Sequence, residues 1–312
     1  MILTVTPNPS LDRTYEVPAL ERGEVLRATG ERTDPGGKGV NVSRAVAAAG
    51  HRTVAVVPLG GAPGALVAEL LAGQGIEVAP VRVAGHTRSN IAVAEPDGTL
   101  TKINAPGPEL TADEAEAILR SVGVHAPTAD WVACCGSLPR GLAPEWYAEL
   151  VARAHGHGSR IALDTSGPSL LAALSARPDV VKPNVEELAE AVGRPLATVG
   201  DAVKAAEELR AAGAGAVLAS LGADGQLLVS KAGVLHGYAA VAAVRSNVGA
   251  GDASLAGFLA AGGEGPGALA AAVAHGAAAV QLPGSEMPTP ADLNPSAVTV
   301  TADVPLDRAL SE

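Results

Sequence analysis

The sequence predicts an α/β fold in which a doubly wound, mostly parallel sheet carries helices on both faces. Short apolar or β-branched runs alternate with longer Ala- and Leu-rich stretches of helical period, which is the rhythm of βαβ units. Hydrophobic residues make up 47% of the 312 residues but aromatic residues only 2%, so the core must consist of Ala, Val and Leu packed at short range. No low-complexity linker or fixed-period repeat divides the chain, so one domain is expected over residues 1–312.

The individual elements follow in order from the first residues. A strand is expected at Ile2–Val5, a helix at Val40–Ala49, a strand at Thr53–Val57 and a helix at Ala65–Leu71. Later strands, each followed within a few residues by a helical pattern, are expected at Trp131–Cys134, Ile161–Leu163, Val180–Val181 and Ala216–Ala219. In a doubly wound sheet ligands collect at the carboxyl ends of the strands.

Two segments break this rhythm. Arg13–Thr33 is predicted to form short strands with turns, and Asn90–Asn104 a hairpin around Asp97 and Gly98. Together they are expected to form a small separate sheet.

Composition limits the partners and the compartment. The net charge of −11 offers no basic field for a nucleic-acid backbone, so nucleic acid is not expected as a partner. A bridge between the adjacent Cys134 and Cys135 would be strained, so free thiols in a reducing cytoplasm are expected. The first residues lack a basic segment followed by an apolar one, and Ala268–Val280 is too short to span a bilayer. Neither export nor membrane insertion is therefore expected.

Polar residues cluster directly after the expected strands. They are Asn8 and Asp12, Gly136 and Ser137, Asp164, Lys182 and Asn184, and Ser220 and Gly222. One such residue alone would usually be a helix cap or a turn former. Five clusters at one edge of the sheet indicate a ligand site.

The segment Ser246–Ser254 is predicted to be a loop that enters a helix. Small residues at Gly249, Ala250 and Gly251 let the backbone approach an anion, which the helix end attracts. Asp252 lies beside that anion site, where a carboxylate would repel a phosphate but serve well as a base for a hydroxyl proton. The alternative is that Asp252 simply caps the helix.

A second glycine loop, Pro35–Arg44, also runs into a helix. It is not a P-loop, because Arg32 occupies the first glycine position and Gly39 the hydroxyl position. Side chains on a first helical turn lean back toward its start, so Asn41 is expected to reach a polyhydroxylated ligand on the Gly36 and Gly37 amides. A glycine-rich turn with a solvated lysine is the structural alternative.

Both glycine loops resemble the two signatures of the phosphofructokinase B family of ribokinase-like carbohydrate kinases, and the resemblance covers essentially the whole chain. The start Thr6–Asp12 and the Gly-Gly-Lys-Gly form resemble the branch that holds 1-phosphofructokinase and tagatose-6-phosphate kinase. The resemblance implies a ribokinase-like fold with a small β lid from about 13–33 and 88–104. It also implies a homodimer through that lid.

The resemblance assigns roles residue by residue. Catalysis falls to Asp252 as base, with Gly249, Ala250 and Gly251 as the anion hole. The substrate-binding set is Asp12, Gly37, Lys38, Asn41, Arg88, Ser89, Asn90 and Ser137, of which Arg88, Ser89, Asn90 and Ser137 contact the phosphate of the substrate. The nucleotide set is Lys182, Asn184, Glu187, Ser220, Gly222 and Gly225, with Glu187 acting on Mg²⁺ through water.

The implied function is an ATP- and Mg²⁺-dependent transfer of phosphate to a sugar phosphate, with fructose 1-phosphate expected as acceptor and tagatose 6-phosphate or fructose 6-phosphate as alternatives. Asn247 stands where the family usually has Thr, and Cys134-Cys135-Gly136-Ser137 replaces a more common Ser-Gly-Ser.

Two other functional classes are alternatives to the kinase. A nucleotide-binding oxidoreductase should show a glycine fingerprint after its first strand, and the segment Thr6–Ser10 does not have one. A catalytically silent sugar-phosphate sensor would not need Asp252. His275 is expected to be a packing residue.

Overall fold

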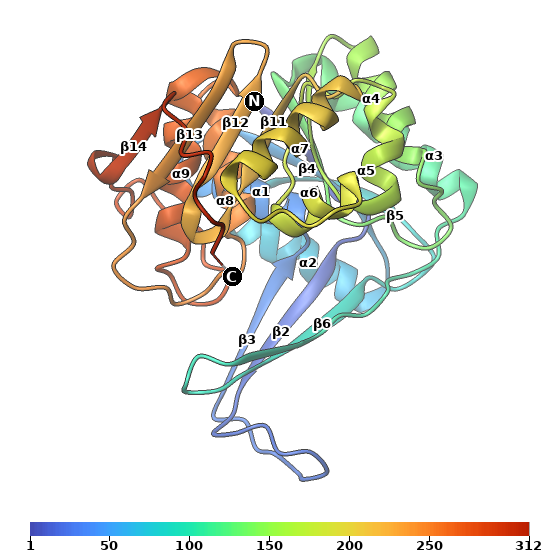
Figure 1. The fold of residues 1–312 in the computed structure, drawn as a ribbon. Helices are drawn as coiled ribbons and strands as arrows, with labels where there is room; N and C mark the ends of the chain where they lie inside the picture. The colour runs from blue at the N-terminus through green and yellow to red at the C-terminus, as the bar shows by residue number, and fades with distance from the viewer. Residues whose placement is uncertain (312) are drawn as a thin grey trace.

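The computed structural model describes residues 1–311 and is built around a ten-stranded sheet (Figure 1). Short β-branched and apolar runs form its central strands, which are buried on both faces as expected of parallel strands under helices. In spatial order the strands are β14 (Val298–Thr301), β13 (Gly233–Ala239), β12 (Gln226–Ser230), β11 (Ala216–Ser220), β10 (Val180–Val181), β9 (Arg160–Asp164), β8 (Trp131–Cys135), β1 (Ile2–Val5), β4 (Thr53–Leu59) and β5 (Glu77–Arg82).

The strands from β5 to β11 are parallel, whereas β12, β13 and β14 extend the sheet in antiparallel order. The prediction that a helix follows the strand at Ala216–Ala219 was wrong. A 3₁₀ turn at Gly222–Asp224 leads instead into β12. The five-residue gap between β11 and β12 is a hairpin connection, too short for a crossover helix. The other strands predicted from the sequence are confirmed.

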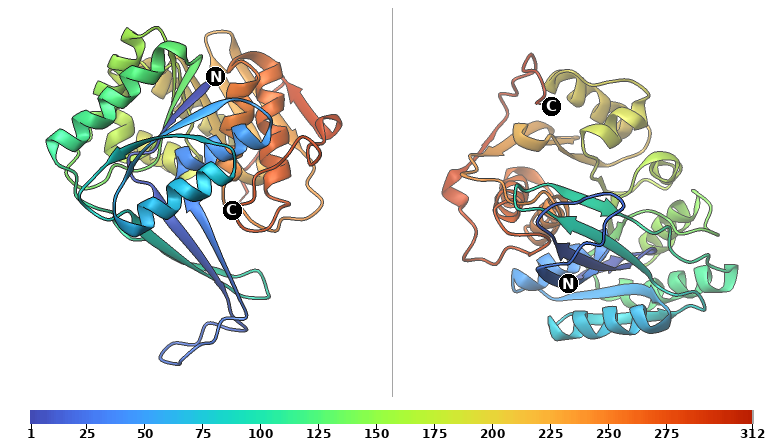
Figure 2. Two further views of the ribbon diagram at one scale, coloured as in Figure 1. Left: turned by 180° about the vertical axis from the view of Figure 1, so that it is seen from behind. Right: turned by 90° about the horizontal axis from the view of Figure 1, so that it is seen from below.

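Helices cover both faces of the sheet, which confirms the predicted doubly wound class (Figure 2). One face packs against α1 (Lys38–Ala48), α2 (Gly61–Gly73), α8 (Ala250–Ala260) and α9 (Gly265–Ala279). The other packs against α3 (Ala112–His125), α4 (Trp146–Gly156), α5 (Gly167–Leu174), α6 (Val185–Val192) and α7 (Val199–Ala211). The period of two along β4 divides its side chains between the two cores: Val54 and Val56 face one, Ala55 and Val57 the other.

Within residues 1–311, no helix combines the length and the apolar character that crossing a membrane requires.

A second sheet of four strands projects from the main body (Figure 1). Its order is β3 (Gly30–Gly36), β2 (Ser10–Glu16), β6 (Arg88–Ala94) and β7 (Leu100–Ile103). The predicted hairpin around Asp97 and Gly98 is confirmed, with Gly98 in the left-handed region at φ 92°. The strands begin closer to the main sheet than predicted, because β2 starts at Ser10 and β3 runs to Gly36. This sheet therefore begins and ends beside the predicted ligand site.

Candidate functional site

The carboxyl end of β9 places a buried aspartate between two lysines. Asp164 is the last residue of β9 and is fully buried. Its Oδ1 accepts a hydrogen bond from Lys38 Nζ at 2.7 Å, and its Oδ2 forms an ion pair with Lys182 Nζ at 2.9 Å. Lys38 begins α1 and Lys182 follows β10, so three elements meet at this carboxylate. Lys38 also donates to Glu187 Oε1 at 3.0 Å.

The charges of this group set one another's protonation. Burial alone would raise the pKa of Asp164, but Lys182 and Lys38 outweigh it and hold that pKa below its usual range. Burial lowers the pKa of Lys38, yet Asp164 and Glu187 raise it above its ordinary value. Lys38 therefore stays charged and Asp164 stays a carboxylate at neutral pH.

Asp252 lies in the first turn of α8 and faces the same group of charges. It is 7% exposed, and burial together with the nearby Asp164 carboxylate raises its pKa to about 7. Lys182, Lys38 and a 2.9 Å hydrogen bond from Asn41 Nδ2 act in the opposite direction. Gly249 is the N-cap residue and no side chain caps α8, so the capping alternative for Asp252 is not what the structure contains. A carboxylate poised near neutrality is suited to general base catalysis. We call Lys38, Asp164, Lys182, Glu187 and Asp252 the carboxyl-edge cluster.

The loop before Asp252 leaves its backbone open to an anion. Gly249 adopts the left-handed region at φ 79°, and a Cβ there would lie 2.9 Å from Met287 Cε. A Cβ on Gly251 would lie 3.2 Å from Lys182 Nζ, so the buried ammonium stands directly beside the helix start. The first amides of a helix have no intrahelical partner. Ala250 is the first residue of α8. The free amides at this helix start and the Lys182 side chain together form a site that favours an anion.

The predicted sugar residues meet where β2 and β3 leave the main sheet. Asp12 Oδ1 accepts hydrogen bonds from Ser10 Oγ at 2.6 Å and from Asn90 Nδ2 at 2.9 Å. A Cβ on Gly36 would overlap the Asp12 carboxylate, so only glycine permits this approach. Gly37 also has to be glycine, because its φ of 112° is a backbone conformation that residues with a side chain rarely adopt. The glycines thus bring Asp12 to the start of α1.

Arg88 holds the base of the projecting sheet. Its Nη1 donates to the carbonyl of Ala105 at 2.9 Å and its Nη2 to the carbonyl of Asn8 at 3.1 Å, and burial lowers its pKa. Asn8 Nδ2 in turn lies 3.5 Å from Oγ of the exposed Ser137. Ser89 lies opposite Leu11 in the β2–β6 pair. Arg88, Asn8 and Ser137 therefore form one connected polar strip.

The predicted nucleotide residues lie after β10 and β11. Asn184 and Glu187 form a capping box at the start of α6: Glu187 N donates to Asn184 Oδ1 at 2.7 Å, and Asn184 N to Glu187 Oε2 at 3.0 Å. Ser220 is bridged to Asn184 across neighbouring strands. Gly222 is exposed, whereas Gly225 has a packing reason to be glycine because a Cβ would overlap the carbonyl of Gly237. The capping box uses Oε2 of Glu187 and leaves Oε1 to accept the hydrogen bond from Lys38.

Two residues of this region were given no role from the sequence. Asp164 was recognised only as one of the polar residues after the strands, and Arg44 only as the end of the second glycine loop. Both are buried and each contacts predicted site residues. His275 packs against Gly257 and its Nδ1 pairs with the carbonyl of Ala271 at 2.8 Å, as expected for a packing residue.

Within residues 1–311, no group of three or more His, Cys, Asp or Glu side chains is arranged to hold a metal ion. Mg²⁺ keeps most of its waters in proteins and often binds through one or two carboxylates together with substrate phosphates. Glu187 is a partly exposed carboxylate 3.0 Å from Lys38 Nζ, and it fits such an indirect role.

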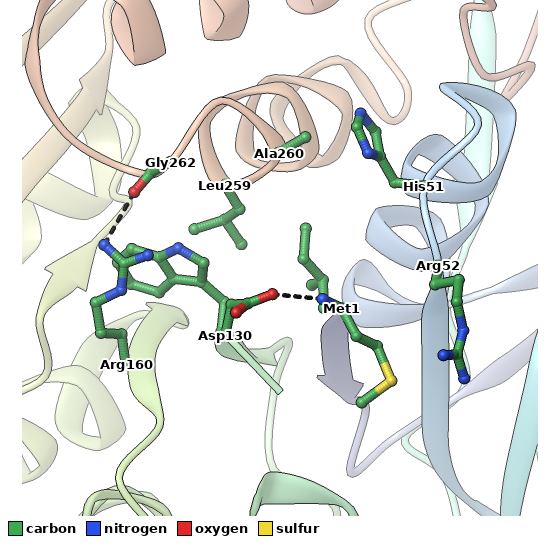
Figure 3. Close-up of a pocket in the computed structure, with 10 residues that line it drawn as sticks. Met1, His51, Arg52, Asp130, Arg160, Leu259, Ala260 and Gly262 are labelled. Atoms are coloured by element: carbon green, nitrogen blue, oxygen red, sulfur yellow. Dashed lines mark hydrogen bonds and ion pairs between the residues drawn. The ribbon is translucent and has the colours of Figure 1, made fainter. Parts of the chain in front are cut away.

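A cavity of about 220 Å³ lies at the opposite, amino edge of the sheet (Figure 3). Residues at the starts of β1, β8 and β9 line it. Figure 3 shows Met1 paired with Asp130, and Arg160 donating to the carbonyl of Gly262 at 3.0 Å. This amino-edge cavity contains none of the predicted site residues.

A family model described as pfkB family carbohydrate kinase matches residues 6–292. The 1-phosphofructokinase of Rhodobacter capsulatus is 42% identical over 260 residues, which cover 83% of this chain and 82% of that protein. The 1-phosphofructokinase of Haloferax volcanii is 41% identical, with 84% of each chain covered.

The phosphofructokinase-2 of Escherichia coli, solved in complex with substrates and products, superimposes with a TM-score of 0.88 at 34% identity. The match covers 93% of this chain and 96% of that one. A tetrameric inhibited form of the same protein gives a TM-score of 0.82, with 89% and 92% of the two chains covered.

Proposed function

The chain belongs to the pfkB family of carbohydrate kinases, and from this membership we propose that it transfers the γ-phosphate of ATP to the 6-hydroxyl of fructose 1-phosphate. The enzyme is a phosphotransferase that acts on a sugar hydroxyl. The observation that carries the proposed mechanism is Asp252, a buried carboxylate with a pKa near neutrality directly after the open amides of Gly249–Gly251. The 1-phosphofructokinase relatives support the choice of acceptor.

In the proposed reaction Asp252 accepts the proton of the 6-hydroxyl as that oxygen attacks the γ-phosphorus in line. The bond from the γ-phosphorus to the β–γ bridging oxygen breaks, and ADP leaves with the electron pair. The amides of residues 249–251 and the Lys182 ammonium stabilise the charge that develops on the phosphoryl oxygens. Bound Mg²⁺ supplies further neutralisation of the phosphate charges.

The sugar phosphate is proposed to lie between the start of α1 and the projecting sheet. Asp12, Asn41 and Asn90 offer acceptors and donors for the sugar hydroxyls, and Gly37 lets the backbone approach the ring. The phosphate is proposed to contact Lys38, Arg88, Ser89, Asn90 and Ser137. Lys38 already has two carboxylate partners, so a phosphate must compete with Asp164 and Glu187 for it.

The nucleotide is proposed to lie across the ends of β10 and β11. Lys182, which lies beside the start of α8, and Glu187 are proposed to order the phosphates and Mg²⁺. Asn184 supports Glu187 through the capping box. Ser220, Gly222 and Gly225 are proposed to border the nucleoside.

The projecting sheet is proposed to act as a lid on a single kinase domain and to pair with a second copy of the chain. Ile91 and Ile103 lie opposite each other on this sheet and are 38% and 61% exposed. Covering such side chains with another sheet is favourable. The oligomeric form of the Escherichia coli protein supports a homodimer as the minimal unit.

A reducing cytoplasm is proposed as the compartment. Both Cys134 and Cys135 are free and buried on β8, and burial raises the pKa of each thiol. These thiols are neutral and shielded, which suits a cytoplasmic metabolic enzyme.

A panel of acceptors with Mg-ATP tests the function. We expect kcat/KM to be highest for fructose 1-phosphate and at least about tenfold lower for free fructose, because an uncharged sugar loses the charge-assisted contact proposed between the substrate phosphate and Arg88. A higher value for tagatose 6-phosphate or fructose 6-phosphate would change the acceptor and leave the kinase intact. A preference for free fructose would also overturn the role given to Arg88.

A further inference from the structure

Arg44 is a buried arginine beneath the active-site end of α1. It is 7% exposed, and its guanidinium contacts four separate parts of the chain. Its Nε donates to Gln74 at the end of α2 (3.1 Å), and its Nη2 pairs with Asp34 of β3 (3.5 Å). Its Nη1 donates to Asn41 Oδ1 at 3.3 Å and lies 3.5 Å from Ser285 Oγ.

The contact with Asn41 fixes which end of that amide faces Asp252. Arg44 and Asn41 are three residues apart on α1 and so lie on the same side of the helix. A guanidinium only donates hydrogen bonds, so it must face the amide oxygen of Asn41. The amide nitrogen is then turned the other way, where it donates to Asp252 Oδ2 at 2.9 Å.

We propose that Arg44 is a positioning residue that holds the Asn41 amide in the orientation that donates to the catalytic base Asp252. The inference rests on the proposed function, because it takes Asp252 to be the base. Arg44 itself touches neither acceptor nor nucleotide in this arrangement. It acts through Asn41.

The orientation of the amide matters because its two ends favour opposite forms of Asp252. An NH₂ group pointing at the carboxyl favours the carboxylate, which is the form that accepts a proton. A reversed amide would present its oxygen to the carboxyl and favour the protonated acid. The other charged or titratable groups that face Asp252 from neighbouring elements are Asp164, Lys182, Lys38, Cys135 and the Arg44 guanidinium itself.

The remaining partners keep Arg44 from turning away. Asp34 also accepts from Arg32 Nε at 2.7 Å, so the carboxylate that anchors Arg44 is itself fixed within β3. Gln74 is the C-cap residue of α2, and Ser285 belongs to the loop that also presents Met287 to Gly249. Arg44 thus joins the projecting sheet, α2 and this loop to the amide that orients the base.

The test is the dependence of kcat on pH in an Arg44→Met variant. We expect the acid limb of the kcat–pH profile to move to higher pH by about one unit and kcat at pH 7 to fall about fivefold, because Asn41 is free to reverse. Arg44→Lys keeps a donor-only side chain and should bring the limb back toward its original position. The matched control is Arg153→Met, which removes an arginine paired with Glu116 and Glu149 on the surface and should leave the limb unmoved.

A double-mutant cycle separates action through Asn41 from general damage to the fold. In an Asn41→Leu background, Arg44→Met should move the limb much less than in the wild type, because only the direct effect of the guanidinium charge on Asp252 remains. A further movement of similar size there, or an unmoved limb in Arg44→Met alone, would overturn the proposal. If Arg44→Met does not fold, judged by thermal unfolding, the shorter and uncharged Arg44→Gln replaces it, with the same expected shift and the same refuting result.

A failure of the proposed kinase mechanism itself would be seen in a different variant. If Asp252→Asn kept normal turnover, Asp252 would not be the base, whatever the Arg44 variants do.

Discussion

Both edges of the main sheet carry charged side chains, but these are buried at the carboxyl edge and exposed at the amino edge. At the carboxyl edge Asp164 is fully buried and Lys182 is 6% exposed, and the carboxylate is shared by two lysines. At the amino edge the Asp130 side chain is 72% exposed where it pairs with the amine of Met1. Burial strengthens electrostatic coupling and makes each partner costly to remove. The comparison indicates that burial, more than the number of charges, distinguishes the edge that holds the proposed site from the opposite edge.

The largest effect expected at the carboxyl edge is that of Asp252→Asn. The change keeps the shape and removes the basicity, so kcat should fall by about 10² to 10⁴ while ATP binding survives. Steady-state kinetics and a nucleotide titration measure the two quantities. Near-normal turnover would leave Asp252 without a role in proton transfer.

The same variant also has a stability signature. The folded pKa of Asp252 is raised above its unfolded value, so its ionisation destabilises the fold increasingly as pH rises from about 4 to about 7 and fully above that. Asp252→Asn should therefore unfold at a higher temperature than the wild type at pH 8, with the gain disappearing below pH 4. In the wild type, kcat should rise with pH up to about 7 and then level off.

Asp164→Asn should be the most destabilising change at this edge. It leaves the buried Lys182 and the neighbouring Lys38 without their shared carboxylate, a loss of about 3–5 kcal/mol in the free energy of unfolding. The folded pKa of Asp164 lies below its unfolded value, so its stabilisation is present above about pH 4 and is lost as pH falls through the folded pKa. Denaturant unfolding at pH 7 and pH 3 measures this. An equal deficit at both pH values would assign the loss to packing instead of charge.

Much of this contrast was visible in the sequence before the fold was known. The short apolar strands and the glycine loops predicted the sheet, its carboxyl edge and Asp252, because these depend on local pattern. The antiparallel strands β12 and β13 were not predicted, since the βα rhythm was extended past Ala216–Ala219 and nothing local distinguishes a hairpin strand from a crossover one.

The missing parts of the site depend on long-range contacts. Lys38 and Asp164 are 126 residues apart in sequence, so their hydrogen bond follows only from the order of β1, β8 and β9 in the sheet. Arg44 lies on a helix in which a charged residue would ordinarily face solvent. Only the packing of α1 against α8 and β3 makes it a buried partner of Asn41.

Arg88→Lys tests whether an arginine at the carboxyl edge binds substrate, in comparison with Arg160 at the amino edge. Lysine cannot reproduce the planar fork of arginine, so we expect KM for the sugar phosphate to rise about tenfold and KM for ATP to change far less. Arg160→Lys at the amino edge is the matched control, because Arg160 also donates to a backbone carbonyl, and it should change neither constant. Equal changes in both constants for Arg88→Lys would mean that its bonds to Ala105 and Asn8 mainly support the projecting sheet.

The smallest effect is expected from Asp130→Asn, the amino-edge counterpart of Asp164→Asn. The Met1 amine depresses the pKa of Asp130, but the carboxylate is largely exposed, so water and salt screen the pair. The free energy of unfolding should fall by less than about 1 kcal/mol, and kcat and both KM values should stay unchanged. Raising the salt concentration should remove the stability difference for Asp130→Asn and leave most of that for Asp164→Asn, because buried pairs are screened much less. A deficit for Asp130→Asn as large as that for Asp164→Asn would show that burial does not distinguish the two edges.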